Sequence, residues 1–373
     1  MLVPLGPKLM QELSLSTSRF GWLLSSYGIG AAVAGLLGAI WIDKWERKKL
    51  LLWLCLLFIC STLLFSLQSN YWALCLTRTM SGIAGGLAGA VIQAIIADQI
   101  PTERRGQVSS WLVSLFAINN IAGIPLALWI ASESSWRTPF TLLVAIAVLA
   151  MGCAIRWLPR QAVLPSPSHS CFTQWQHSFS APGHATALLF VFCGVFSSYC
   201  LIPFLALYLT HQVGMDEQQL AIIYFVGGIS MLVAGQWIGR WADKRGKARA
   251  FITLALLSLL PLYGITQLPP LSLGWVLPCI MLFFMIVPGR TIPAIALVST
   301  VILPRYRGGF MAINSTCQQL AITSATLICS YMVTSDPEFG VRGYGYAGAL
   351  SVISTLMAMV LCYRLGKLGV KTK

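Results

Sequence analysis

Two arginines, Arg78 and Arg290, each lie inside a long apolar run of the sequence. A guanidinium stays protonated at any physiological pH, so neither side chain can carry a proton. If the runs cross a membrane, such a charge needs a partner. For Arg290, which follows Pro288 and Gly289, we expect an anionic group of a substrate, backbone carbonyls freed by a helix break, or a carboxylate of a neighbouring helix. Arg78 lies closer to the end of its run, so its alternative is to reach the water interface.

The carboxylates are placed differently, because all eleven lie in or near the polar segments that separate the apolar runs. Uncharged polar residues within the runs are the remaining candidates to contact a solute, although each could equally form a hydrogen bond between helices. These residues are Tyr27, Gln93, Asn119, Asn120, Tyr224, Asn314, Gln318 and Gln319. A polar and partly aromatic cavity suits an amphipathic organic solute better than a bare ion.

Motifs for other kinds of chemistry are absent from the sequence. The eleven cysteines are spread along the chain with no C-x-x-C or metal-like spacing, which is typical of small apolar side chains in a membrane. There is no G-x-x-x-x-G-K-[ST] loop for ATP, no H-E-x-x-H zinc motif and no nucleophile elbow. We therefore expect neither an enzyme nor a bound metal or cofactor, and we expect a proton gradient to supply the driving force.

The composition is that of a membrane protein. Of 373 residues, 57% are hydrophobic and only 10% are charged, and the mean hydropathy is +0.76. The net charge of +14 does not indicate nucleic acid, because the basic residues lie in short segments between apolar runs. Nineteen of the 25 lysines and arginines fall on one side of the predicted membrane, which is therefore the cytoplasmic side and holds the C-terminus. We expect the chain to reside in a lipid bilayer of the bacterial inner-membrane type.

Eleven apolar runs are long enough to cross a bilayer, which takes about twenty residues. They cover residues 20–42, 50–67, 72–96, 108–131, 139–158, 185–209, 220–239, 250–267, 273–303, 310–333 and 344–363. Residues 1–13 would reach only about 20 Å as a helix, against roughly 30 Å of hydrocarbon, so we expect an incomplete first helix. A carboxylate for proton coupling would then lie on the missing part of that helix, facing Arg78.

An internal repeat divides the chain. Residues 28–44 and 228–244 share eight identities in seventeen positions, and residues 101–106 align with 304–309 at a similar offset. Self-similarity of this length indicates a duplicated unit, here of six helices. The expected organisation is an N-terminal membrane half at 1–158 with its first helix incomplete, a cytoplasmic linker at 159–183, and a C-terminal membrane half at 184–373.

The polar segment in each copy of the repeat resembles the signature of the major facilitator superfamily, Gly-x-x-x-Asp-Arg/Lys-x-Gly-Arg/Lys-Arg/Lys. The second copy matches it at Gly239, Asp243, Lys244, Gly246 and Lys247, and the first, looser copy at Asp43, Lys44, Arg47 and Lys48. Arg78 and Gly82 resemble the family's fourth-helix Arg-x-x-x-Gly element. The segment Gly123-Ile124-Pro125-Leu126 is similar to a motif of the drug:proton antiporter branch, particularly its sugar-efflux-like permeases.

This resemblance implies a fold of two six-helix halves with a gate on the cytoplasmic side. In that gate Asp43 caps a helix of the opposite half while Arg47 pairs with Asp98, although carboxylates among basic residues can also form solvated ion pairs that contribute little. The other charged members of the expected gate are Lys44, Asp243, Lys244 and Lys247. Close helix packing is expected at the small residues Gly35, Gly82, Gly235 and Gly239, and at Pro125.

We therefore predict an all-α polytopic membrane protein that acts as a secondary active transporter, with a small organic solute or drug exported in exchange for protons by alternating access. Proton-coupled uptake of a small organic metabolite is the alternative, because import and export share this scaffold. A non-transporting membrane sensor is a weaker alternative, since the sequence shows no attached signalling domain. The resemblance also implies that the monomer is the functional unit.

Overall fold

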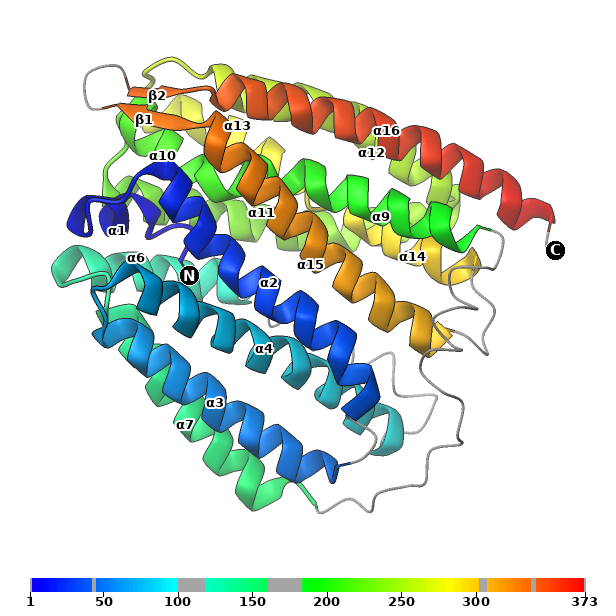
Figure 1. The fold of residues 1–373 in the computed structure, drawn as a ribbon. Coiled ribbons are helices and arrows are strands. Elements are labelled where there is room, and N and C mark those ends of the chain that lie inside the picture. The colour runs from blue at the N-terminus through cyan, green and yellow to red at the C-terminus, as the bar shows by residue number, and fades with distance from the viewer. Residues whose placement is uncertain are drawn as a thin grey trace.

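The computed structural model describes residues 2–41, 45–99, 118–159, 183–301, 307–336 and 340–371. Most of these residues are helical, as the sequence predicts (Figure 1). The helices of the first half are α1 (Gly6–Glu12), α2 (Thr17–Trp41), α3 (Arg47–Leu67), α4 (Tyr71–Gln99), the π-helical η2 (Asn119–Gly123), α6 (Ile124–Glu133) and α7 (Thr138–Trp157). Those of the second half are α9 (His184–Tyr199), η3 (Ile202–Phe204), α10 (Leu205–Tyr208), η4 (Leu209–Val213), α11 (Glu217–Arg245), α12 (Lys247–Gly264), η5 (Ile265–Gln267), α13 (Leu273–Ile286), α14 (Thr291–Val301), α15 (Arg307–Met332) and α16 (Tyr344–Lys371).

The described residues also form two short strands, β1 (Thr334–Asp336) and β2 (Gly340–Arg342), which the sequence did not predict. They pair in the antiparallel direction, with Ser335 opposite Val341. They join α15 to α16, so they form a connection at one end of the helical bundle rather than a layer of the fold.

Eight segments of the described chain are long and apolar enough to cross a membrane. The predicted runs 20–42 and 310–333 also correspond to long helices, since α2 has 25 residues and α15 has 26. The predicted run 108–131 lies partly outside the described residues. The total of eleven spans thus stays a prediction, whereas α1, with seven residues, is too short to span.

The ends of α11 show how local sequence sets the helix boundaries. Its first turn is closed by a capping box, in which the side chain of Asp216 accepts from the backbone N–H of Gln219 and the Gln219 side chain accepts from the N–H of Asp216. Its last turn ends at Gly246, whose φ of 91° suits glycine. Directly after this turn the chain starts α12 at Lys247.

Helix packing follows the two copies of the repeat. In the first half α4 packs against α2 and α3, and α7 against α3; in the second half α9 packs against α15 and α16, and α11 against α13. The halves contact each other where α2 lies beside α15, and where α11 lies against α6 and η2 (Figure 1). Because α2 and α11 carry the two copies of the repeat, these two contacts are related by the duplication.

The largest apolar core joins the two halves at the end of the bundle where α1 and the strands lie. It contains Phe20 and Trp136 of the first half together with Phe204, Phe283 and Tyr344 of the second. In the parts of the chain that the structure describes, the other three buried apolar clusters each belong to a single half. Shared apolar packing is thus concentrated at one end, which the distribution of basic residues predicts to be the outer side.

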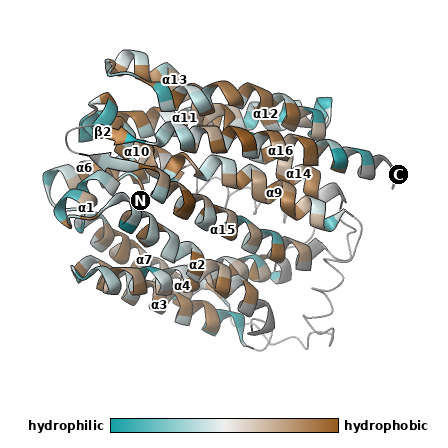
Figure 2. Cartoon of the chain, turned by 45° about the horizontal axis from the view of Figure 1, so that its top comes forward, coloured by the Kyte–Doolittle hydropathy of each residue, from teal (hydrophilic) through white to brown (hydrophobic). Residues whose placement is uncertain are grey.

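Large apolar side chains also cover the outside of the helices. Trp53 is 64% exposed, Leu149 70%, Trp237 77% and Leu260 73%. Figure 2 shows hydrophobic residues along the helices and hydrophilic ones mainly near helix ends. A surface with this many exposed apolar side chains fits hydrocarbon rather than water.

Candidate functional site

Arg290 lies in the break between α13 and α14, and its side chain is only 1% exposed. Its guanidinium is surrounded by hydroxyl groups from three other helices, which we name the hydroxyl cage. Nη1 donates to Ser258 Oγ (3.0 Å) and Thr355 Oγ1 (2.9 Å), and Nη2 donates to Ser197 Oγ (2.8 Å), Ser198 Oγ (3.2 Å) and the carbonyl of Gly194 (3.4 Å). A single side chain thereby ties α14 to α9, α12 and α16.

The hydroxyls of the cage are held in turn by their own hydrogen bonds. Ser258 donates to the carbonyl of Ala255 (2.7 Å), and Thr355 donates to the carbonyl of Ser351 (2.9 Å). Because their protons go to these carbonyls, the hydroxyl lone pairs face the guanidinium. Hydroxyl groups were not among the partners that we expected for Arg290, whereas the backbone carbonyl of Gly194 is of an expected kind. The sequence signal is the set of serines and threonines inside apolar runs, with Ser351 and Thr355 four residues apart.

The hydroxyl cage accounts neither for the positive charge of Arg290 nor for its Nε atom. Within the described ranges no carboxylate pairs with it, so the cage satisfies hydrogen bonds but does not neutralise the charge. Its Nε is buried and has no hydrogen-bond partner among the residues that the structure describes. A buried charge that is left without an anion is costly in a protein interior.

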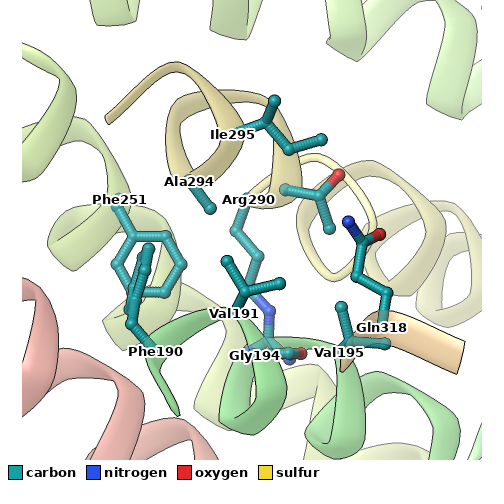
Figure 3. Close-up of a pocket in the computed structure, with 10 residues that line it drawn as sticks. Phe190, Val191, Gly194, Val195, Phe251, Arg290, Ala294, Ile295 and Gln318 are labelled. Carbon is teal, nitrogen blue, oxygen red and sulfur yellow. The ribbon is translucent and has the colours of Figure 1, made fainter. Parts of the chain in front are cut away.

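A cavity of about 30 Å³ lies beside Arg290 (Figure 3). It is lined by Phe190, Val191, Gly194, Val195, Phe251, Arg290, Thr291, Ala294, Ile295 and Gln318. Figure 3 shows Phe190 and Phe251 on one side and Gln318 on the opposite side, with Arg290 between them. The centroids of the two phenyl rings lie 4.7 Å apart, and the rings meet edge to face. The structure thus brings together two of the residues singled out in the sequence, Arg290 and Gln318.

Arg78 has different surroundings, in the first half. Its guanidinium carbon lies 4.9 Å from the ring centre of Tyr27 and 5.5 Å from that of Phe65, which are cation–π distances. Its buried Nε has no hydrogen-bond partner in the described part of the chain. Tyr27, on α2, was also singled out in the sequence, so α2 and α4 place a second pair of predicted site residues together.

The remaining polar candidates are dispersed. Gln319 is partly buried, and its carbonyl faces Gly28 of α2 at the contact between the halves. Asn119 is exposed and begins the π-helical segment η2. The side chain of Asn120 lies outside the described residues. The described side chains of Gln319 and Asn119 are therefore gathered neither with Arg290 nor with Arg78.

The expected cytoplasmic gate is only partly described. At the start of α3, Arg47 Nη1 donates to the carbonyl of Ala94 on α4, at 2.8 Å. Ala94 lies one turn before Asp98, whose side chain is outside the described residues, as are Asp43 and Lys44. The bond to Ala94 places Arg47 near Asp98, and the pairing itself stays a prediction.

The second copy of the motif lies at the end of α11. Asp243 and Lys244 are exposed and Lys247 is partly buried. Within the described ranges Asp243 forms no ion pair. Asp243 is thus exposed without an ion pair among the described residues, and its part in the gate stays a prediction.

Contacts at the opposite end of the molecule connect the halves and were missed in the sequence. Lys8 of α1 forms an ion pair with Glu217 of α11 (3.7 Å) and donates to the carbonyl of Ala131. Trp22 Nε1 of α2 donates to the hydroxyl of Tyr331 on α15 (2.7 Å). We name these two pairs the outer contacts. Their members are about 200 and 300 residues apart, which local pattern cannot connect.

Two of the predicted packing glycines lie where helices approach each other. A Cβ added at Gly35 would lie 2.5 Å from Thr316 Oγ1 of α15, in the opposite half. A Cβ added at Gly82 would overlap the carbonyl oxygen of Tyr27, where α4 meets α2. Small residues at these positions let the helices pack closely.

The other packing expectations fare differently. Among the described residues, a Cβ at Gly235 would have only Ile292 within reach, at 3.6 Å, and a Cβ at Gly239 would meet no atom within 4 Å. The described residues therefore show no close helix contact at Gly239, and close packing there stays a prediction. Pro125 lies in the first turn of α6, after η2, where its missing N–H costs little.

These observations define a class of protein: an α-helical membrane protein of two repeated halves, with one buried and one partly buried arginine inside its membrane spans. The chain matches the description "Major Facilitator Superfamily" over residues 1–326. The chain belongs to this superfamily of transporters, so the resemblance seen in the motifs is confirmed.

Three similar proteins illustrate the match. The "Uncharacterized MFS-type transporter YceJ" of Bacillus subtilis (strain 168) is 25% identical over 380 residues, which cover 99% of this chain and 93% of that protein. The crystal structure of a D-xylose-proton symporter has a TM-score of 0.75 at 19% identity and covers 96% of this chain and 91% of its own. That of a mutant of the nucleoside transporter NupG has a TM-score of 0.71 at 16% identity and covers 98% and 94%. At these identities the two structures show a shared fold.

Proposed function

We propose that this transporter exports a small organic solute or drug across a bacterial inner membrane in exchange for protons, and that it works as a monomer. The observation that carries the proposal is how the halves meet. They touch along two helix pairs related by the duplication, α2 with α15 and α11 with α6, and in the described chain their shared apolar core lies at one end. Halves joined in this way can rock about a site between them, which is alternating access.

The proposed solute site takes one pair of residues from each half. Arg290 and Gln318 line a cavity in the second half, and Arg78 with Tyr27 forms a cation–π pair in the first. Charged groups at membrane depth are costly and are kept where they serve a pathway. Coupling to protons requires a group that titrates, which arginine does not supply, so we assign the two arginines to solute binding rather than to proton transfer.

Proton-coupled uptake is the second candidate. It is favoured by the fold shared with the D-xylose-proton symporter, in which solute and proton move together. The arrangement of helices is the same for import and export, so the two functions are separated by the direction in which the solute moves relative to the proton.

The test is proton movement in inside-out membrane vesicles with an acid interior and an enclosed pH dye. Under the proposal, one solute of a broad panel triggers proton efflux in the wild type, and Arg290→Ala abolishes the response. Arg249→Ala, which removes an exposed arginine of the same half, should respond like the wild type. A solute that drives proton movement only in vesicles with an alkaline interior supports uptake instead. No response to any solute in either direction would refute coupling to protons.

A further inference from the structure

In the part of the chain that the structure describes, the charged side chains well inside the membrane spans are all of one sign. Arg78 and Arg290 lie within α4 and at the α13–α14 break, whereas the described carboxylates lie at helix ends or between helices. A solute that passes either of these two residues therefore meets a positive charge. Of the two, Arg290 is the one that lines a cavity in the described part of the chain.

The hydroxyl cage fixes that positive charge in place. Four of the five guanidinium N–H groups are on Nη1 and Nη2, which donate only to neutral oxygens. The charge cannot be removed by deprotonation, and the cage offers no carboxylate to balance it. Among the described residues no carboxylate balances this charge, and Nε has no acceptor there.

The cavity beside Arg290 has the size and lining for an anion. Its volume of about 30 Å³ compares with roughly 10–15 Å³ for one water-sized group. It thus accepts two or three such groups, which suits the head of a carboxylate. Gln318 adds an amide that can donate, while Phe190 and Phe251 offer an apolar face for the rest of the molecule (Figure 3).

We propose that this cavity is an anion subsite, and that the transported solute is an organic carboxylate with an apolar or aromatic body. The inference rests on the proposed function as a solute transporter. The carboxylate neutralises Arg290 and accepts hydrogen bonds from its Nε and from Gln318. A neutral analogue leaves the arginine unbalanced, and a cationic analogue is repelled by it.

The test compares ligands of the same shape and different charge. Purified full-length protein in nanodiscs is titrated with acetate, phenylacetate and 4-phenylbutyrate, and with phenylacetamide and phenethylamine as neutral and cationic counterparts of phenylacetate. Binding is read from tryptophan fluorescence and from the shift in Tm. We expect a carboxylate to bind at least tenfold more tightly than phenylacetamide, and phenethylamine to show no saturable binding. Equal affinity for the acid and the amide, or no binding by any carboxylate, overturns the proposal.

Variants tie the charge preference to this cavity. Arg290→Gln should abolish it, Arg290→Lys should keep part of it, and Gln318→Leu, which leaves the cage intact, should weaken carboxylate binding several-fold. Arg249→Gln is the matched loss of an exposed charge and should bind like the wild type. If Arg290→Gln does not elute as a folded protein, the Arg290→Lys and Gln318→Leu variants test the proposal. Unchanged preference in both would place the anion elsewhere and overturn the proposal.

Counterflow in proteoliposomes separates this inference from the proposed function. A carboxylate that binds in nanodiscs but is not exchanged in counterflow refutes transport and leaves the subsite intact. A neutral or cationic solute that is exchanged equally by wild type and Arg290→Gln supports transport and refutes the subsite.

Discussion

The contact between α2 and α15 provides a direct way to shift the protein between its conformations. Gly21 of α2 packs against Ser330 of α15, in the opposite half and next to the Trp22–Tyr331 outer contact. A Cβ added at Gly21 would overlap the Cβ of Ser330 and lie 2.5 Å from its Oγ, against 3.4 Å or more in ordinary contact. The Oγ can rotate away but the Cβ cannot. Gly21→Ala should therefore force the two helices apart by more than about 1 Å.

The size of the effect follows from the cost of overpacking. An extra methyl group in a tight contact costs about 1–3 kcal/mol. Because this contact joins the halves, the cost falls on the conformation in which they touch here and not on one in which they have separated. The equilibrium should shift toward separation by about 5- to 150-fold. Hydrogen exchange of α2 and α15 near their outer ends, measured by mass spectrometry in nanodiscs, should accelerate by a similar factor.

Two control substitutions make the result specific. Gly152→Ala adds a methyl group where no atom lies within 4 Å, so it should leave exchange at the outer ends unchanged. Gly82→Ala creates an overlap with the backbone of Tyr27 inside the first half, so it should lower Tm without selective exchange at the contact between the halves. Wild-type exchange rates in Gly21→Ala, or equal acceleration in Gly82→Ala, would refute the view that this contact holds the conformation.

Three further predictions concern the same equilibrium and the gate. Glu217→Gln breaks the partly exposed pair with Lys8, which is worth at most about 1 kcal/mol, so exchange at the start of α11 should rise only a few-fold, and less at high salt. Trp22→Phe keeps most of the ring but loses the hydrogen bond to Tyr331, worth about 0.5–1.5 kcal/mol, so exchange at the outer contacts should rise up to about tenfold. An unchanged rate would show that the bond does not hold the halves. Asp43→Asn should impair transport in vesicles while the amount of protein in the membrane stays constant, and full transport would contradict the gate.

The fold could be predicted from the sequence because its determinants are local or periodic. Long apolar runs specify helices in a bilayer, since a membrane span must satisfy its own backbone hydrogen bonds. The duplication then relates α2 to α11 and predicts two halves before any contact is known. The strands β1 and β2 could not be predicted in this way, because segments of three residues have no periodicity to detect.

The proposed solute site was predictable only as separate residues. Arg290 and Gln318 were recognised because polar groups inside apolar runs are unusual, and the same holds for Arg78 and Tyr27. The hydroxyl cage was not recognised, since its members come from helices that start as much as 160 residues apart in the chain. A serine in a membrane helix most often bonds to its own backbone, so no single one of these residues indicates an arginine site.

The duplication makes the two arginines informative for a further reason, because neither has a counterpart in the other half. At offsets of 200 to 203, Arg290 aligns with residues 87–90, which are Leu-Ala-Gly-Ala, and Arg78 aligns with residues 278–281, which are Pro-Cys-Ile-Met. The helix contacts that join the halves, in contrast, occur in both copies. A rocking mechanism needs matching contacts on the two sides, whereas binding an asymmetric solute needs different groups from each half. Under the proposed mechanism, the chain therefore keeps its symmetry where the halves would move against each other and lacks it at the charged positions that would contact the solute.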